Sequence, residues 1–561
     1  MDKQYFFERN LLALSRRNPE LCSRLSGAQT TLGRYRFLEA RSGDIIPAWV
    51  DPSGSAHPLH SLIDPRREAK RLVDSVNDEG FLILLGLGGG FCAEAALERE
   101  DTSLVLVIDY DIDGLAELLC SKDYIRIFRD PRFHLLACPR GPAIEEYILG
   151  IYQPVLAGGI RTLPLRARTA SDAASFAGAA AAVESAVERI TADYSVQAYF
   201  GTRWFSNIIR NLEQAEKNEG PLQPVRRAAI AAAGPSLNVQ IPVIREKRGS
   251  RFLIAADTAL PALLAGGITP DAVVSIDCQH ISCYHFMGGL PGEVLLFLDI
   301  ASPPVIASRS CSPRFFSGGH PLSRYISRSW RSLPEVDTSG ANVTYAALSL
   351  AEKLGAKTIE LYGADFSYPL GASYARGTYI HPYFEIQQNR LAPLEALFSA
   401  FLYRSPLEKK TGNAGSWYYE TKSLKFYREN LEAKSRSMQA AILPAAGLGA
   451  PILVPARTAE TQLPAPGNLS LFAPGPASMK AADFLAQYRD RIRLLPVPEK
   501  DAAYPGALDG EGPAILATLL PAAADIKRRN PGLKTREILE RTKSYFIEQL
   551  DSVLRHKSGI W

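Results

Sequence analysis

The sequence predicts an α/β protein with a Rossmann-like N-terminal unit, a central doubly wound parallel sheet and a helical C-terminal region. Short apolar strands alternate with helices twice, over residues 65–113 and again over 224–365. Such strands are typical of parallel sheets that helices cover on both faces. A chain of 561 residues allows about three to four domains. We predict an N-terminal domain (1–200), a central domain (201–440), and a linker with a helical domain (441–561).

Composition excludes several other classes. The chain is 46% hydrophobic and 22% charged, which excludes a largely disordered chain, a coiled coil and a collagen-like fibre. The net charge is +4, and the sequence contains no long block of like charges. We therefore expect neither a nucleic-acid nor a membrane partner. Seven scattered cysteines predict no disulfide framework and no zinc ribbon. The charged N-terminus lacks the apolar core of a signal peptide, so we expect a cytoplasmic protein.

The first unit is predicted from a helix over 65–80, an apolar strand that ends in the glycine turn Gly86–Gly90, a second helix, and a strand over 103–113. This is the order of a right-handed βαβ unit. The turn could approach a nucleotide, with Asp109 at the ribose, although Phe91 replaces the third glycine of GxGxxG.

Two alternatives stay open for this unit. The aspartates of the DYDID run, Asp109, Asp111 and Asp113, could hold a divalent cation. The glycine turn could also be a tight connection that binds nothing. The Ala-rich stretch 169–194 that follows predicts a long helix.

The second unit places polar and glycine residues directly after its apolar strands. They are Gly234, Pro235, Ser236, Asp257, Asp277, Asp299, Gly363, Ala364 and Asp365. Because ligands of open α/β sheets bind beyond the carboxyl ends of the strands, we expect a nucleotide site at this edge. The loop from Thr338 to Asn342 opens a helix and offers free N–H groups to an anion. No P-loop, GxSxG elbow or HExxH motif occurs.

These strand-end residues carry a family resemblance over roughly residues 225–430. AAAGPSLN (231–238) resembles the Gly-Pro-Ser-Leu signature of the bacterial flagellar motility accessory factors, a glycosyltransferase family with a domain of unknown function 115. Residues 252–279 and 337–379 are similar to its next blocks. The last block also resembles bacterial sialyltransferases that use CMP-sialic acid, and Tyr374 matches their version, where the motility factors often have His. The resemblance therefore implies a sialyltransferase-like central domain.

The sheet edge and the resemblance together predict a set of donor-binding residues. They are Gly234, Pro235, Ser236, Asp257, Asp277, Thr338, Ser339, Gly340, Asn342, Gly363 and Tyr368. The resemblance implies that the turn 234–236 contacts CMP and that Thr338–Gly340 receive the cytidine or the donor carboxylate. Asp257 and Asp277 stand where the sialyltransferases have asparagines.

The resemblance also implies the catalytic residues. Asp365 would position the nucleotide or its ribose, and Tyr374, with Tyr368 beside it, would hydrogen-bond the leaving phosphate. A general base must deprotonate the acceptor, and His381, seven residues after Tyr374, is the predicted base. His280 is the reserve candidate, followed by His285 and His320.

The implied function is transfer of a nonulosonic acid (pseudaminic, legionaminic or sialic-acid-like) from a CMP donor to Ser or Thr of flagellin. No cofactor is required by this mechanism, although the DYDID run leaves a divalent metal open. The alternatives are an ATP-dependent 6-hydroxymethylpterin diphosphokinase and a non-catalytic flagellin-binding accessory protein. The aromatic stretch 411–432 has roughly helical spacing, which predicts core, or an acceptor groove formed by Trp417, Tyr418 and Tyr419.

Overall fold

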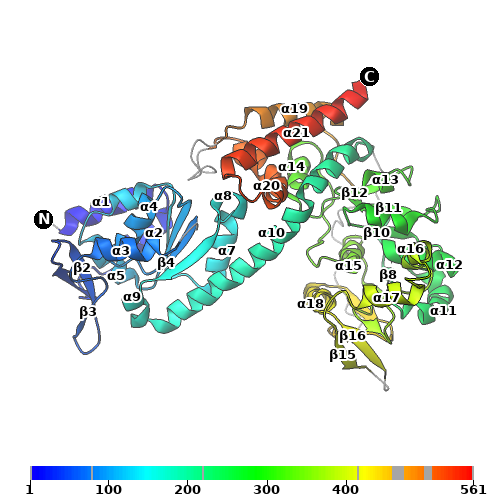
Figure 1. Ribbon diagram of the computed structural model, residues 1–561, viewed down its shortest axis with the longest axis horizontal. Helices are drawn as coiled ribbons and strands as arrows, with labels where there is room; N and C mark the ends of the chain where they lie inside the picture. The colour runs from blue at the N-terminus through cyan, green and yellow to red at the C-terminus, as the bar shows by residue number, and fades with distance from the viewer. Residues whose placement is uncertain are drawn as a thin grey trace. The chain divides into compact units, whose positions relative to one another are not determined.

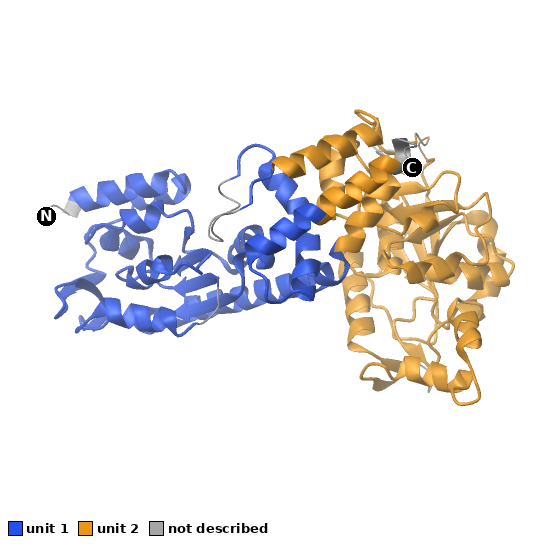
Figure 2. Cartoon of the chain, turned by 45° about the horizontal axis from the view of Figure 1, so that its top comes forward, with its two compact units in different colours: residues 1–201, 495–544 blue, residues 202–494, 545–561 orange. Residues whose placement is uncertain are grey.

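The computed structural model describes residues 3–76, 80–217, 220, 222–412, 416–457, 473–497 and 508–558. Two compact units form: Met1–Gly201 with Leu495–Ser544, and Thr202–Leu494 with Tyr545–Trp561 (Figure 2). Residues after 441 therefore contribute to both units, and residues 458–472 of the predicted linker lie outside the described residues. None of the described helices combines the length and hydropathy that a membrane span needs.

Unit 1 is built on a four-stranded parallel sheet with the order β6-β5-β4-β7. Its strands are β4 (Phe81–Leu85), β5 (Leu104–Asp109), β6 (Phe133–Ala137) and β7 (Ile160–Pro164). The side chains of β4 alternate between two cores, since Leu82 and Leu84 pack in one and Phe81, Ile83 and Leu85 in the other. Helices thus cover both faces, and the βαβ prediction is confirmed.

Unit 1 contains further elements. The helices are α1 (Lys3–Ser15), α2 (Pro19–Ser26), α3 (Pro65–Asp74), α4 (Phe91–Glu98), α5 (Ile112–Leu119), α6 (Ile125–Arg129), α7 (Gly141–Ile151), α8 (Pro154–Ala157), α9 (Arg166–Ser171) and α20 (Gly512–Arg529). A small antiparallel sheet contains β1 (Tyr35–Glu39), β2 (Ile45–Val50) and β3 (Ala56–Pro58). The predicted helix at 65–80 begins at Pro65 because Asp64 caps it, accepting from Arg67 N at 2.9 Å.

The long Ala-rich helix extends further than predicted. After α9, the helix α10 runs through Ala173–Ala215, 43 residues, so its range spans the boundary between the two units. Its second half continues the apolar period, and Phe205, Ile208 and Leu212 are buried in unit 2. The helix therefore outlasts the Ala run because a second core covers it.

Unit 2 contains a seven-stranded parallel sheet with the order β12-β11-β10-β9-β8-β13-β17 (Figure 1). The strands are β8 (Arg227–Ala231), β9 (Phe252–Ala256), β10 (Ala272–Ser275), β11 (Leu295–Asp299), β12 (Arg314–Phe316), β13 (Thr358–Tyr362) and β17 (Ala441–Pro444). The chain moves outward from β8 to β12 and then returns to the other side of β8. The gap between β8 and β13 is thus the topological switch point of a doubly wound sheet, as predicted.

Helices and short 3₁₀ turns connect these strands or, in the case of α19, follow the last of them. They are α11 (Leu237–Lys247), η1 (Arg248–Ser250), η2 (Asp257–Ala259), α12 (Leu260–Ala265), η3 (His280–Phe286), α13 (Pro304–Ala307), α14 (Pro321–Ser329), α15 (Val343–Lys353), α16 (Ile380–Gln387), α17 (Leu394–Leu402), α18 (Lys422–Ser437) and α19 (Ala481–Leu494). The last helix, α21 (Thr535–Ser558), contributes to both units. Side chains of α15 and α18, such as Leu350 and Leu431, share one core with the sheet.

The helical interpretation of residues 411–432 is wrong for their first half. Trp417–Glu420 form strand β16, which pairs with β14 (Tyr368–Pro369) and β15 (Glu408–Thr411) in an antiparallel sheet. Trp417 and Tyr419 lie on the same face, with ring centroids 5.2 Å apart, while Tyr418 is buried on the other. Aromatic residues suit a half-buried strand, and Thr421 then caps α18.

Candidate functional site

The two loops at the switch point of unit 2 pack directly against each other. Ser236 N donates to Asp365 Oδ2 at 2.8 Å, the Ser236 hydroxyl donates to Asp365 Oδ1, and Gly234 N donates to Gly363 O at 2.9 Å. A Cβ on Gly234 would lie 2.4 Å from Asp365 Oδ2. Only glycine leaves room for this approach, so the loops after β8 and β13 form one rigid floor.

A third loop, which sequence reasoning assigned to a linker, covers this floor. Residues 445–450 follow β17, and Leu448 N donates to Ser236 Oγ at 2.7 Å. A Cβ on Gly449 would lie 2.5 Å from Asp365 O, so this glycine too is required for a close approach. A cavity of about 160 Å³ lies beside Ser236, Asp365 and this loop. The only sequence signal was a pair of glycines, Gly447 and Gly449, after a short apolar strand.

These contacts use the hydrogen-bonding groups of Ser236 and Asp365 within the protein. Burial raises the pKa of the Asp365 carboxyl, and its hydrogen bonds from Ser236 oppose that shift. Ser236 and Asp365 thus stabilise the turn that contains Pro235. In this arrangement the Ser236 hydroxyl and the Asp365 carboxylate bond to each other and not to a ligand.

Replacing Asp365 with alanine is expected to open the switch point. The change leaves the buried Ser236 N–H without its acceptor. Each unsatisfied buried group of this kind lowers the stability of the fold by about 1–3 kcal/mol. We expect binding of CMP, measured by isothermal titration, to weaken at least tenfold while far-UV circular dichroism stays unchanged. Unchanged CMP affinity would contradict a nucleotide site at this loop.

A second group lies at the carboxyl ends of β9 and β10. Asp257 is buried and accepts from Ser275 Oγ at 2.7 Å and from Thr258 N at 2.7 Å. Thr258 Oγ1 lies 3.4 Å from His285 Nε2. Burial raises the pKa of Asp277, the charge of Asp257 adds to this, and His285 opposes it. The structure therefore brings both predicted aspartates close to His285.

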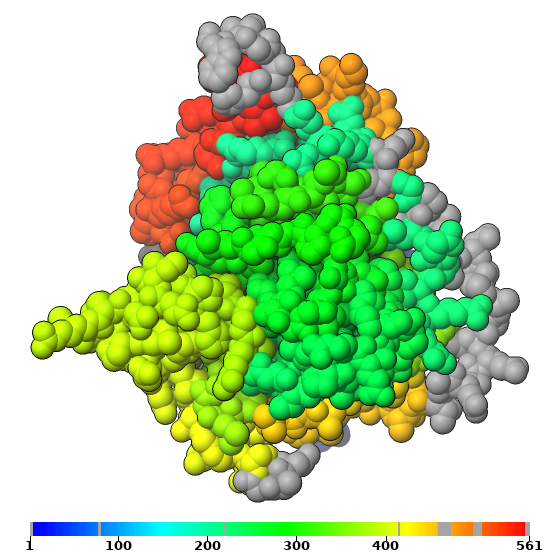
Figure 3. All heavy atoms as spheres, turned by 90° about the vertical axis from the view of Figure 1, so that its right-hand side faces the viewer, coloured from blue at the N-terminus to red at the C-terminus, as the bar shows by residue number. Residues whose placement is uncertain are grey.

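Tyrosines from the segment after β14 complete this group. The rings of His285 and Tyr379 lie 4.6 Å apart, and those of Tyr379 and Tyr374 lie 6.3 Å apart. Burial raises the pKa of Tyr374, and the neighbouring Tyr379 and Tyr368 add to the shift. Both effects keep the Tyr374 phenol protonated and able to donate at neutral pH. Figure 3 shows the face where the yellow-green segment after β14 adjoins the green atoms of the preceding part of unit 2.

One cation acts on these tyrosines. The Arg404 guanidinium stacks on Phe401, with its Cζ 4.0 Å from the ring centroid, and Phe401 lies 6.1 Å from the Tyr374 ring. Its charge opposes the raised pKa of both Tyr374 and Tyr379. Arg404 is exposed and has no acidic partner among the described residues. Sequence reasoning missed Tyr379 and Arg404, because neither belongs to a recognisable motif.

The histidines are separated by the fold. His381 packs on Phe398, with centroids 5.0 Å apart, and burial lowers its pKa; the nearby charges are those of Glu385 and Arg376. His280 is exposed, and His320 is a partly buried cap of α14 that accepts from Leu322 N at 3.2 Å. Of the histidines whose side chains the structure describes, His285 alone lies within the group around Asp257, and its Nδ1 is buried without a hydrogen-bond partner.

The loop before α15 is bonded largely to itself. Asp337 accepts from Ser339 N, Ser339 Oγ and Tyr345 OH at 2.6–3.0 Å, and it pairs with Lys434 at 3.0 Å. The Asn342 side chain caps α15 by accepting from Tyr345 N, which occupies one of the N–H groups expected to be free.

Thr338 connects this loop to the strand end at Asp299. Its hydroxyl donates to Gly318 O at 3.1 Å, and a Cβ on Gly318 would lie 2.2 Å from Asp299 Oδ2. Burial raises the pKa of Asp299 to about 6. Thr338 and Asp299 therefore lie close together, on either side of Gly318.

In unit 1, side chains of the protein fill the space around the glycine turn. Arg168 Nη2 lies 2.6 Å from Asp109 Oδ1, Asp109 Oδ2 accepts from Leu87 N at 2.8 Å, and Gly89 N donates to His60 Nε2 at 2.8 Å. A Cβ on Gly86 would lie 2.7 Å from Arg168 Cγ. Asp109 therefore stabilises the turn and pairs with Arg168. A ribose-binding acid at this position would instead face the ligand.

The other two aspartates of the run point to separate partners. Asp111 caps α5 through Gly114 N at 3.0 Å, and Asp113 accepts from Gln29 N at 2.8 Å. Among the described residues no three side chains of His, Cys, Asp or Glu are grouped to hold a metal ion.

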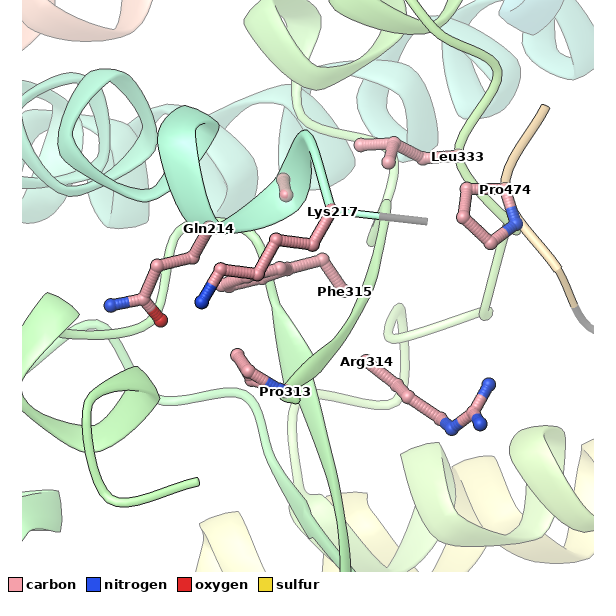
Figure 4. A pocket seen from close by; sticks show the side chains of 8 residues that line it. Gln214, Lys217, Pro313, Arg314, Phe315, Leu333 and Pro474 are labelled. Atoms are coloured by element: carbon pink, nitrogen blue, oxygen red, sulfur yellow. The ribbon is translucent and has the colours of Figure 1, made fainter. Parts of the chain in front are cut away.

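A small pocket beside the end of α10 is also unsuited to a ligand. It is lined by Gln214, Lys217, Arg314 and Phe315, among others, and holds about 10 Å³, room for about one water (Figure 4). Next to it the buried Arg331 donates to Ala215 O and, at 3.0 Å, to Lys217 O. This corner anchors the end of α10.

Comparisons with known proteins agree with this architecture. Residues 203–371 match the family described as 6-hydroxymethylpterin diphosphokinase MptE-like. Two uncharacterized proteins of Treponema pallidum (strain Nichols) are 39% identical over 153 residues (26% of this chain, 54% of theirs) and 35% identical over 164 residues (28% and 78%). This chain thus spans about half the length of the first relative. The structure of MAf glycosyltransferase from Magnetospirillum magneticum AMB-1 matches with a TM-score of 0.59 at 14% identity, over 98% of this chain and 96% of that one.

Proposed function

Since the chain belongs to the MptE-like family and has the fold of the motility accessory factor (MAf) glycosyltransferases, we propose that it is a glycosyltransferase. Its donor would be a CMP-activated nonulosonic acid, of the pseudaminic, legionaminic or sialic-acid-like kind, and its acceptor a Ser or Thr of flagellin. The observation that carries the proposal is the group of Asp257, His285, Tyr374, Tyr379 and Arg404 at one edge of the sheet. It combines a base, phenol donors and a cation next to the switch point.

The proposed reaction is a single displacement. The acceptor hydroxyl attacks the anomeric carbon, the bond from that carbon to the phosphate oxygen breaks, and CMP leaves with the electron pair. Tyr374, with Tyr379 and Tyr368 nearby, would donate to the phosphate as its charge develops, and Arg404 would neutralise part of that charge. The loop Thr338–Gly340, with Asn342, would receive the cytidine or the donor carboxylate. No metal is needed for these steps.

Two histidines compete for the role of base. The sequence resemblance favours His381, whereas the geometry favours His285, because His285 alone lies beside the aspartates and Tyr379. The proton of the acceptor would pass to a ring nitrogen of the base.

A pyrophosphate-transferring function is the second candidate, because the matching family carries a diphosphokinase description over residues 203–371. That reaction would need ATP and a divalent cation. A non-catalytic flagellin-binding role is the third alternative.

Isothermal titration with CMP and with ATP, each with and without Mg²⁺, separates these candidates. We expect CMP to bind without Mg²⁺ and ATP to be silent. Arg404→Gln should weaken CMP binding about tenfold and leave cytidine binding unchanged, since cytidine lacks the phosphate. Arg390→Gln, a change on an exposed turn, is the matched control. Mg²⁺-dependent ATP binding with CMP silent would overturn the transferase in favour of the kinase.

A further inference from the structure

A wide groove lies at the opposite edge of the unit 2 sheet. It holds about 880 Å³ and is lined by residues at the amino ends of β8 and β9, by η1 and by the end of α15. The strands between the two edges are mostly five residues long, so the groove lies about 17 Å from the candidate donor site. The proposed transfer reaction uses none of its residues.

Four arginines line the groove, and their surroundings differ. Arg248 makes a two-pronged contact with Asp271, at 2.8 and 2.9 Å, and Arg251 donates to Glu360 at 2.7 Å. Arg226 and Arg227 are both exposed, and neither has an ion pair or a side-chain hydrogen bond among the residues that the structure describes. Two positive charges at the groove are thus uncompensated.

The floor of the groove is apolar. Leu222, Val225 and Phe252 are only partly buried and pack against the core of the sheet, and Leu354 lies beside them. An inorganic anion would leave this floor in contact with water. A single-stranded nucleic acid would use a row of aromatic platforms, whereas three of these four floor residues are aliphatic.

We propose that this groove is a docking surface for a partner polypeptide segment that carries acidic and apolar side chains. Its carboxylates would pair with Arg226 and Arg227, and its apolar side chains would cover the floor. Contacts of this kind steer association and weaken as salt screens them. The docking surface is independent of the chemistry proposed for the other edge.

Fluorescence anisotropy with a labelled twelve-residue peptide of Glu-Glu-Leu repeats tests the proposal on the full chain. We expect saturable binding that the double variant Arg226→Glu/Arg227→Glu weakens at least tenfold. The control Arg328→Glu/Arg390→Glu changes the net charge equally on exposed positions elsewhere in unit 2 and should alter affinity less than twofold. A peptide with Ser in place of Leu should bind at least fivefold more weakly.

Three results would overturn this assignment. They are no binding of the Glu-Glu-Leu peptide to the unaltered chain, an equal loss in the control variant, and displacement of the peptide by oligo(dT) at lower concentration. The last result would mark a nucleic-acid surface. Circular dichroism and CMP titration of the Arg226→Glu/Arg227→Glu variant check that its fold and its other edge are intact.

Discussion

Replacing His285 with glutamine is expected to lower kcat for glycosyl transfer by about 10²- to 10⁴-fold, the usual contribution of a general base. Glutamine keeps a polar side chain of similar reach but cannot take the acceptor proton. His285 touches Tyr379 and lies 3.4 Å from Thr258, so the reacting group would sit among residues that already contact one another. The measurement is transfer of sugar from the CMP donor to flagellin, with KM for the donor determined separately.

The matched variant is His381→Gln. If His285 is the base, His381→Gln retains most of kcat, because its ring packs on Phe398 away from the aspartates. The reverse pattern would show that the sequence resemblance identified the base and the geometry did not. An increase in KM for the donor with kcat unchanged in His285→Gln would assign His285 to donor positioning.

Replacing Arg168 with methionine is expected to lower the free energy of unfolding of unit 1 by about 3–5 kcal/mol. Arg168 and Asp109 are both almost fully buried, so removing the guanidinium leaves a buried carboxylate without its counterion. Glycine turn 86–90 packs on the same pair, and its connection to β5 through Leu87 N would loosen. Urea unfolding followed by circular dichroism measures the change.

The pH dependence of that variant has a definite sign. Burial already raises the pKa of Asp109, and losing the cation raises it further. A carboxyl whose folded pKa exceeds its unfolded value near 4 favours folding when protonated, so the stability loss should be smallest at low pH and grow as pH rises. The double variant Arg168→Met/Asp109→Asn should recover much of the loss. Equal destabilisation at every pH would show that Arg168 acts by packing alone.

The arrangement of the strands could be predicted, because apolar runs and the residues after them report directly on a parallel sheet. Asp257, Asp277 and Asp299 do meet at one edge. What could not be predicted is which partner each polar group takes. Ser236 and Asp365 face each other, 129 residues apart, and no local pattern encodes that pairing.

Two outcomes depended on contacts between residues that lie far apart in the sequence. The local sequence around Trp417 and Tyr419 is compatible with either a helix or a strand. The segment forms a strand because it pairs with β14 and β15. The glycine turn in unit 1 resembles a ligand loop, yet Arg168, contributed from 59 residues beyond Asp109, occupies its interior. Long-range contacts determined both outcomes.

The glycine loop after β17 also affects when the switch point can form during synthesis. The N–H group of Leu448 donates to Ser236 Oγ, and Leu448 lies 212 residues after Ser236 in the sequence. At about 5–20 residues per second, the ribosome makes this loop roughly 10 to 40 seconds after Ser236. Until then the floor around Asp365 lacks its cover, and a fragment that ends at residue 440 would never acquire it. Under the proposed function, stabilisation of the nascent chain by CMP should therefore begin only after residue 450 has left the exit tunnel.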